Sequence, residues 1–466
     1  MATNAEAVDS PRRERLLDRR YLPLTLGAVA LVTLGAFENR AVGTALPSLA
    51  TDLGAISAFG VLNAAPLASY VVSLAIAGLW SDRSGPVPAL RAGVLSFGVA
   101  QVLVGTAPTV HFVIAGRLLS GFAEGLIDVA LMVLVARILP PSLRPRMFSL
   151  FAAMWVLPSI LGPGVAGVIT EYAGWRWVFL AALGVLVPTW ILLRHAVHSL
   201  RSEAESDETE ESASRRAVVP WAIGAATAVF VLTIAGERLE SSTTTPGIVI
   251  AVAVAALAVC SVRMLPPGSF RAARGLPAVV ALRGLVAAAF AGTGAWLPLL
   301  LTEVYGFRPT LAGVSLTITG VCWALGSWLQ GRDHDLPRPL VLRSGLTAMT
   351  VGLAATALLG WTDLPAWVGL SGWAIAGVGM GLTSPSLSLL TLDLSEPTHV
   401  GRNSGAAQMA GSLSVATILA VSGTLVAFAG EDPGRPTFAA ILTSGAALAL
   451  LALLVAGRAT APEPAP

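Results

Sequence analysis

The chain has 466 residues, of which 55% are hydrophobic and 12% are charged, and its mean hydropathy is +0.75. Soluble proteins average about 25% charged residues, so this composition excludes a soluble globular domain and favours repeated membrane spans. The net charge is +2 and no segment forms a basic block, which excludes a nucleic-acid partner.

Apolar segments long enough to cross a bilayer as helices recur along the chain. A polar tail, residues 1–21, precedes the first segment and is too long for the start of a cleaved signal peptide, so we predict an uncleaved first span. Fourteen spans are predicted, at 22–47, 57–80, 89–107, 111–136, 148–170, 176–194, 218–236, 246–265, 279–301, 310–330, 340–360, 365–390, 403–429 and 436–457.

The fourth predicted span carries three ionisable residues within an apolar run, namely Arg117, Glu124 and Asp128. Their spacings of seven and four residues place them on one helical face. A charge at membrane depth costs at least about 2.5–3.5 kcal/mol, so this face is predicted to line a polar path. A buried ion-pair network that only holds helices together is the alternative.

Arginine placement predicts the orientation, because every basic residue is arginine and lysine is absent. With the N-terminus in the cytoplasm, 22 arginines fall in inside segments and four in outside loops. This asymmetry follows the positive-inside rule and places both termini in the cytoplasm of an inner-membrane, multi-pass protein.

An internal repeat divides the chain into related parts. Residues 116–126 (GRLLSGFAEGL) match residues 372–382 (GWAIAGVGMGL) at an offset of 256. We therefore predict a six-helix bundle at 22–194, an acidic cytoplasmic linker at 195–217, two inserted spans at 218–265, a second six-helix bundle at 266–457 and a tail at 458–466.

Other function classes are disfavoured by what the spans contain. The five histidines fall in loops or at helix edges, and Cys260 and Cys322 lack metal-ligand spacing, so neither an enzyme nor a metal or cofactor site is predicted. The sequence contains no segment typical of an ion-channel selectivity filter, so a channel is disfavoured. Two related bundles around a midplane site match the general plan of a transporter.

The loop after the second span reads GLWSDRSG over residues 78–85 and resembles the loop signature G-x-L-a-D-R-x-G-R-[KR] of the major facilitator superfamily. The chain departs from the signature at Pro86 and Val87, where the family has two basic residues. The resemblance implies a gating loop formed by Gly78, Asp82, Arg83, Gly85 and Arg91. It also implies that the loop carboxylate meets the start of the thirteenth span.

Three further motifs resemble the fourteen-span drug:proton antiporters of this superfamily. Glu38 and Arg40 stand at the Asp and Thr positions of D-x-T-x-x-N-x-A-L-P, and Arg117 stands in a motif similar to R-x-x-Q-G. A segment of the fifth span resembles the export signature G-P-x-x-G-G and contains Pro158, Gly162, Pro163 and Gly167. Proline at 163 lacks an N–H for the carbonyl of residue 159, so a bend is expected there.

The resemblance implies an all-α major facilitator fold and proton-coupled export of hydrophobic or amphipathic compounds. Counted at 1.5 Å per residue from the middle of its span, Glu38 lies about 5 Å towards the outside, and Arg117 lies about 9 Å in the same direction, so the two side chains can pair. Glu38 is predicted to be the main proton-exchanging site, paired with Arg117, with Glu124 or Asp128 as the second. A superfamily carrier for a metabolite or lipid, or an importer, remains the alternative. The expected partners are a small-molecule substrate, protons and the lipid bilayer, and the expected state is a monomer.

Polar side chains are sparse in the second bundle, which favours a largely apolar substrate surface. Such a surface suits amphipathic or aromatic molecules better than sugars. The predicted substrate cavity contains Arg40, Trp296, Trp323, Trp373 and Gln408. Each tryptophan alone is more often an interfacial anchor or a packing residue.

Overall fold

The computed structural model describes residues 14–55, 58–198, 218–237, 244–332, 337–429 and 434–459. Within these ranges the regular structure is helical. The central part of the acidic linker, residues 199–217, lies outside them. Short helical turns η3 (Ser269–Arg271), η4 (Pro397–His399) and η5 (Ala456–Arg458) connect longer helices.

The helices of the first half are α1 (Leu22–Asp52), α2 (Phe59–Ser84), α3 (Pro86–Gly105), α4 (Val110–Ile138), α5 (Arg144–Ala153), α6 (Val156–Ala173) and α7 (Arg176–His198). The inserted pair is α9 (Val218–Glu237) and α10 (Thr244–Met264). The second half holds α11 (Leu276–Glu303), α12 (Pro309–Arg332), α13 (Arg338–Trp361), α14 (Ala366–Asp393), α15 (Val400–Ala429) and α16 (Arg435–Val455).

Ten helices in the described ranges are long and apolar enough to cross a membrane, which establishes a polytopic helical membrane protein. Each predicted span except 148–170 overlaps one helix, but fourteen crossings stay a prediction. The predicted span 148–170 is divided into α5 and α6 at Met154 and Trp155. Pro158 explains the break, because it cannot donate to the carbonyl of Met154 and its ring crowds that carbonyl.

Helix packing repeats between the halves at positions that the internal repeat aligns. A Cβ on Gly121 of α4 would lie 2.0 Å from the Pro66 carbonyl oxygen of α2. At the aligned position in α14, a Cβ on Gly377 would lie 2.9 Å from the Thr319 carbonyl oxygen of α12. Glycine is therefore required for both crossings, and the two halves build the same closely packed pair.

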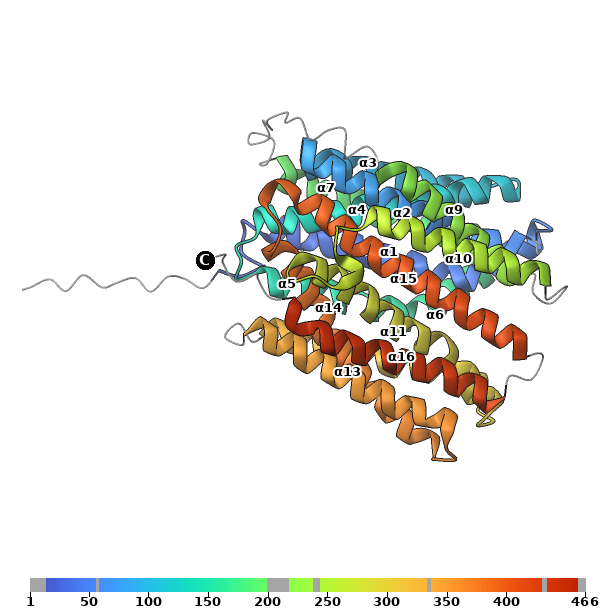
Figure 1. The fold of residues 1–466 in the computed structure, drawn as a ribbon. Coiled ribbons are helices and arrows are strands. Elements are labelled where there is room, and N and C mark those ends of the chain that lie inside the picture. The colour runs from blue at the N-terminus through green and yellow to red at the C-terminus, as the bar shows by residue number, and fades with distance from the viewer. Residues whose placement is uncertain are drawn as a thin grey trace, which may run out of the picture.

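We call α1–α7 the N bundle and α11–α16 the C bundle. Figure 1 shows α13 and α16 on the far side of the molecule from α3 and α7, with α15 beside α10. Successive long helices run antiparallel, and α6 continues in the direction of α5. The start of α15 and the end of α2 therefore share one end, which also holds α5 and the end of α16. We call this the Asp82 end and the other the Asp52 end.

The two bundles touch in the half of the molecule nearest the Asp82 end. A Cβ on Gly78 of α2 would lie 2.9 Å from the Gly401 carbonyl oxygen of α15, so these backbones are in direct contact. On the other side of the interface, Ser149 of α5 donates to Gln330 Oε1 of α12 at 2.7 Å. These contacts hold the bundles together at the Asp82 end.

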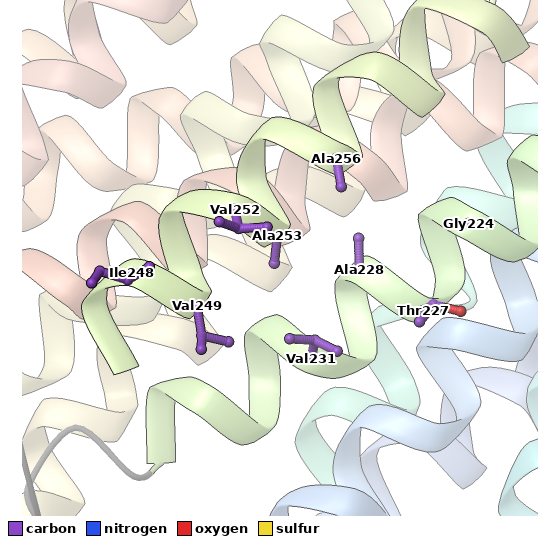
Figure 2. A pocket seen from close by; sticks show the side chains of 9 residues that line it. All are labelled: Gly224, Thr227, Ala228, Val231, Ile248, Val249, Val252, Ala253 and Ala256. Atoms are coloured by element: carbon purple, nitrogen blue, oxygen red, sulfur yellow. The ribbon is translucent and has the colours of Figure 1, made fainter. Parts of the chain in front are cut away.

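The inserted pair lies along the seam between the bundles, where α9 packs on α2 and on α15. A groove of about 330 Å³ runs between α9 and α10 and is lined only by apolar residues and Thr227 (Figure 2). Ile248 and Val252 on its rim are more than half exposed. Because the groove contains no charged residue, the candidate site lies elsewhere.

Candidate functional site

The ionisable face of α4 meets α1 in the middle of the N bundle. Arg117 and Glu38 form an ion pair, and each side chain is about 6% exposed. Arg117 Nε also donates to the Leu62 carbonyl of α2 at 3.4 Å. The ion pair that was predicted from helix depth is therefore present. Together with the Leu62 carbonyl, it connects α1, α2 and α4.

Glu124 follows Arg117 by two helical turns and lies close enough to Glu38 and Asp128 to interact electrostatically with both. Its Oε1 is buried without a hydrogen-bond partner among the described residues. That atom faces α1, since a Cβ on Gly35 would lie 3.8 Å from it. A carboxylate in this position is costly unless a proton or a cation neutralises it.

Asp128 is the member of the stripe nearest the Asp82 end. Its Oδ2 accepts a hydrogen bond from the Tyr70 hydroxyl of α2 at 2.6 Å. The charge of Asp128 also interacts with that of Arg283, which belongs to α11 of the C bundle. Asp128 of the N bundle thus interacts with a cation of the C bundle across the interface between them.

Arg283 is the functional candidate that sequence reasoning missed. Its guanidinium donates to the Gln408 side chain of α15, and to the Ser384 carbonyl and the Ser388 hydroxyl of α14 at 3.3 and 3.4 Å. The signal was available, because Arg283 is one of three arginines within or beside the predicted spans. Tyr70 was likewise missed, since a lone tyrosine in an apolar span carries no motif.

Aromatic side chains of the C bundle gather around Phe290, two helical turns beyond Arg283 on α11. Phe290 stacks on Trp373 at 4.7 Å between ring centroids and meets Trp323 edge to face at 5.4 Å. Trp373 is only 1% exposed, so it supports this aromatic wall from behind. Phe290 and Trp323 keep accessible surface.

Trp296 and Arg40 stand apart from this wall in different ways. The indole of Trp296 donates to the Ser422 hydroxyl of α15 at 2.7 Å, a contact within the C bundle. Arg40 lies in α1, but its side chain is outside the described part of the chain. Of the predicted cavity residues, the structure therefore brings Trp323 and Trp373 together around Phe290, whereas Gln408 contacts Arg283.

The loop carboxylate Asp82 caps the start of α15. Its Oδ1 accepts from the Gly401 N–H at 2.7 Å and its Oδ2 accepts from the Arg402 N–H at 2.8 Å. This is the contact that the loop resemblance implied. Gly85 connects α2 to α3 at φ +74°, a left-handed conformation that favours glycine. Arg83 and Arg91 flank the turn, and Arg83 is exposed.

The export-signature segment lies in α6, which packs against α1 and α12. Pro158 and Gly162 are buried, and α6 continues as a helix across Pro163. A Cβ on Gly167 would come no closer than 3.9 Å to Thr44, so this glycine leaves spare room beside α1. A bend at Pro163 stays a prediction.

These groups could exchange protons and bind an amphipathic molecule. The N bundle supplies three carboxylates in reach of one another, whereas the C bundle supplies a cation and an aromatic wall. Residues 28–419 match the family model described as the Major Facilitator Superfamily.

The chain is also similar to curated proteins over most of its length. It is 25% identical over 395 residues to a Mycobacterium tuberculosis protein named a probable multidrug-efflux transporter, covering 81% of this chain and 82% of the relative. It is 23% identical over 389 residues to Multidrug resistance protein 3 of Bacillus subtilis, covering 81% and 74%.

Among solved structures, a bacterial homologue of the iron transporter ferroportin in an outward-facing state superimposes with a TM-score of 0.68. Its identity of 15%, over 94% of this chain and 98% of that one, makes this a likeness of fold alone. Because the family model covers most of the chain and the helical fold agrees with it, the protein belongs to the Major Facilitator Superfamily of membrane transporters.

Proposed function

We propose that the protein exports hydrophobic or amphipathic compounds across the plasma membrane in exchange for protons. The observation that carries this proposal is the cluster of Glu38, Glu124 and Asp128 with Arg117 in the middle of the N bundle. Burying three carboxylates at membrane depth costs more free energy than helix packing alone would explain, and proton exchange is a function that requires such groups.

Glu38 is the main exchanging site in this proposal. The Arg117 guanidinium favours the ionised carboxylate, whereas drying of its surroundings favours the protonated form. A movement that separates the pair or excludes water would therefore load a proton, and the reverse would release it. The neighbouring Glu124, or Asp128, serves as the second site and extends the path towards the Asp82 end.

Export and orientation are supported by three further observations. The distribution of arginines favours a cytoplasmic Asp82 end with both termini inside. The contacts between the bundles lie at the Asp82 end, so under that orientation the cytoplasmic side is the closed one. Two relatives carry names that refer to multidrug efflux or resistance.

The C bundle favours an apolar or aromatic cargo. Phe290 and Trp323 offer accessible aromatic surface, and the polar groups beside them are few. Sugars need denser hydrogen bonding than this wall provides. A carrier of another metabolite or lipid, including an importer, is the alternative that the following experiment separates.

Transport of ethidium in proteoliposomes tests the proposal. An imposed pH gradient should drive ethidium accumulation by the native protein. Glu38→Gln should abolish this accumulation while ethidium binding and gradient-independent exchange remain measurable. Glu171→Gln makes the same change at the exposed end of α6 and serves as the matched control.

Two outcomes would overturn the assignments. If Glu38→Gln, Glu124→Gln and Asp128→Asn all accumulate ethidium as the native protein does, protons are carried elsewhere. If the native protein shows no gradient-driven transport of ethidium or of any compound against which it protects an efflux-deficient host, proton-coupled export is wrong.

A further inference from the structure

Two oppositely charged groups lie near each other across the interface between the bundles. Asp128, held by the Tyr70 hydroxyl at 2.6 Å, lies on the N bundle. Arg283, held by Gln408 and by α14, lies on the C bundle. Their opposite charges are close enough to attract each other.

Both groups lie in the half of the molecule where the bundles meet. At 1.5 Å per residue, Asp128 is about 6 Å from the middle of α4 towards the Asp82 end, and Arg283 is about 10 Å from the middle of α11 in the same direction. Close by, a Cβ on Gly405 of α15 would lie 2.7 Å from the Leu74 carbonyl oxygen of α2. A movement that opens the Asp82 end must draw Asp128 and Arg283 apart.

From this arrangement we infer that Arg283 is a positioning residue that couples protonation of Asp128 to the relative position of the two bundles. The attraction between the ionised carboxylate and the guanidinium stabilises the arrangement closed at the Asp82 end. A proton on Asp128 removes that attraction and favours the arrangement open at the Asp82 end. Linkage requires the converse as well: opening the Asp82 end weakens the attraction of Arg283 for the ionised carboxylate, and so favours protonation of Asp128.

The charged and titratable groups nearest Asp128 come from α2, from α4 itself and from α11. Tyr70 lies on α2, Glu124 on α4 itself and Arg283 on α11, while Glu38 and Arg117 lie further towards the Asp52 end. The ion pair of Glu38 with Arg117 lies wholly within the N bundle, so it does not connect the two bundles. Arg283 alone among these groups belongs to the other bundle.

The inference rests on the proposed function for its direction. If the Asp52 end faces outside, a proton arriving from outside reaches Asp128, releases Arg283 and returns the empty protein to the inward-open arrangement. This is the step that an exchanger needs after it has released its cargo. The conformational coupling itself can be measured without transport.

The experiment follows the distance between the bundles by single-molecule fluorescence transfer in lipid nanodiscs, with Cys260 and Cys322 replaced by alanine. Dyes are placed at Thr106→Cys and Glu303→Cys, two exposed positions at the Asp52 end of α3 and α11. Between pH 8 and pH 5 the native pattern should shift towards the shorter distance, since closing the Asp52 end accompanies opening of the other. One coupled proton changes the ratio of the two states by at most about tenfold per pH unit.

At every pH, Asp128→Asn should keep the ratio near the value that the native protein has at pH 5. The pH response should therefore be reduced severalfold. Arg283→Gln should shift the ratio at pH 8 in the same direction, and the double variant should add little to either change. Arg343→Gln removes an exposed arginine from α13 of the same bundle and should behave as the native protein. Arg283→Lys, which keeps the charge, should retain most of the response and serves if Arg283→Gln does not fold.

A full pH response in Asp128→Asn, or an Arg283→Gln variant that behaves as Arg343→Gln, would overturn the inference. Suppose instead that the pH response depends on Asp128 and Arg283, but the protein transports neither ethidium nor any compound against which it protects an efflux-deficient host. That result would refute the proposed function and leave the coupling intact. The two failures are therefore distinguishable.

Discussion

The Asp82→Asn substitution tests whether the contact between α2 and α15 acts as a latch. Asp82 accepts one hydrogen bond from each of two consecutive backbone N–H groups, at 2.7 and 2.8 Å. These groups begin α15, a helix of 30 residues whose N-terminus carries roughly half a positive charge. Asparagine keeps the shape of the side chain but removes the charge and presents one accepting oxygen.

The free energy lost in Asp82→Asn follows from the hydrogen bonds that asparagine cannot make. A hydrogen bond to a charged group contributes about 1.5–3 kcal/mol, against about 0.5–1.5 kcal/mol for a neutral one. Asparagine can retain one neutral bond, and its amide nitrogen then faces the second N–H. Two charged bonds contribute about 3–6 kcal/mol on this scale, so the loss is about 1.5–5.5 kcal/mol, and the ratio of the two arrangements should change by at least about tenfold.

The dye pair at Thr106 and Glu303 measures that ratio directly. At pH 8, Asp82→Asn should raise the fraction with the shorter distance between the Asp52 ends, while ethidium binding persists and transport falls. Asp52→Asn is the matched control, because Asp52 also accepts two hydrogen bonds at a helix end, from Trp175 and Arg176, within one bundle. An unchanged ratio in Asp82→Asn, or the same shift in Asp52→Asn, would refute the latch.

Three other predictions follow from the packing and the orientation. Gly121→Ala should lower the thermal midpoint sharply, because its Cβ would lie 2.0 Å from the Pro66 carbonyl oxygen, whereas Gly184→Ala, with nothing within 4 Å, should leave the midpoint unchanged. Ser149→Ala removes the bond to Gln330 and should weaken the closed arrangement by about 0.5–1.5 kcal/mol, about 2–13-fold in the dye ratio; a shift opposite in sign would contradict the assignment of that contact. Cysteines at 203–211 should react with impermeant reagents only from the cytoplasm and one at Tyr172, 81% exposed at the Asp52 end, only from outside; the reverse pattern would invert the proposed topology.

Sequence reasoning predicted the features that depend on one helix or on one motif. Apolar length placed the helices, and the seven-residue and four-residue spacings placed Arg117, Glu124 and Asp128 on one face of α4. Depth along two antiparallel spans was sufficient to pair Arg117 with Glu38. In each case the geometry of a single helix carries the information.

The features that could not be predicted from the sequence depend mainly on contacts between helices that are far apart in the chain. Asp128 meets Tyr70 from α2 and Arg283 from α11, and no local pattern indicates that these three share a depth and face one another. The break between α5 and α6 was missed for another reason. The motif contains both Pro158 and Pro163. The residues alone do not show which proline ends a helix and which lies within a continuous one, because tertiary packing decides this.

The distribution of contacts has a consequence for the balance between the two arrangements. The latch at Asp82, the bond from Ser149 to Gln330 and the attraction between Asp128 and Arg283 all lie in the half nearest the Asp82 end. Each is lost when that end opens. If each contributes at least about 0.5 kcal/mol, and the latch at Asp82 more, a protein that populates both arrangements must gain contacts of similar total free energy at the Asp52 end. Those compensating contacts are absent by necessity from the arrangement described here. A near-balanced pair of states is sensitive to any single term of this size, which is why one proton on Asp128 is sufficient to bias it.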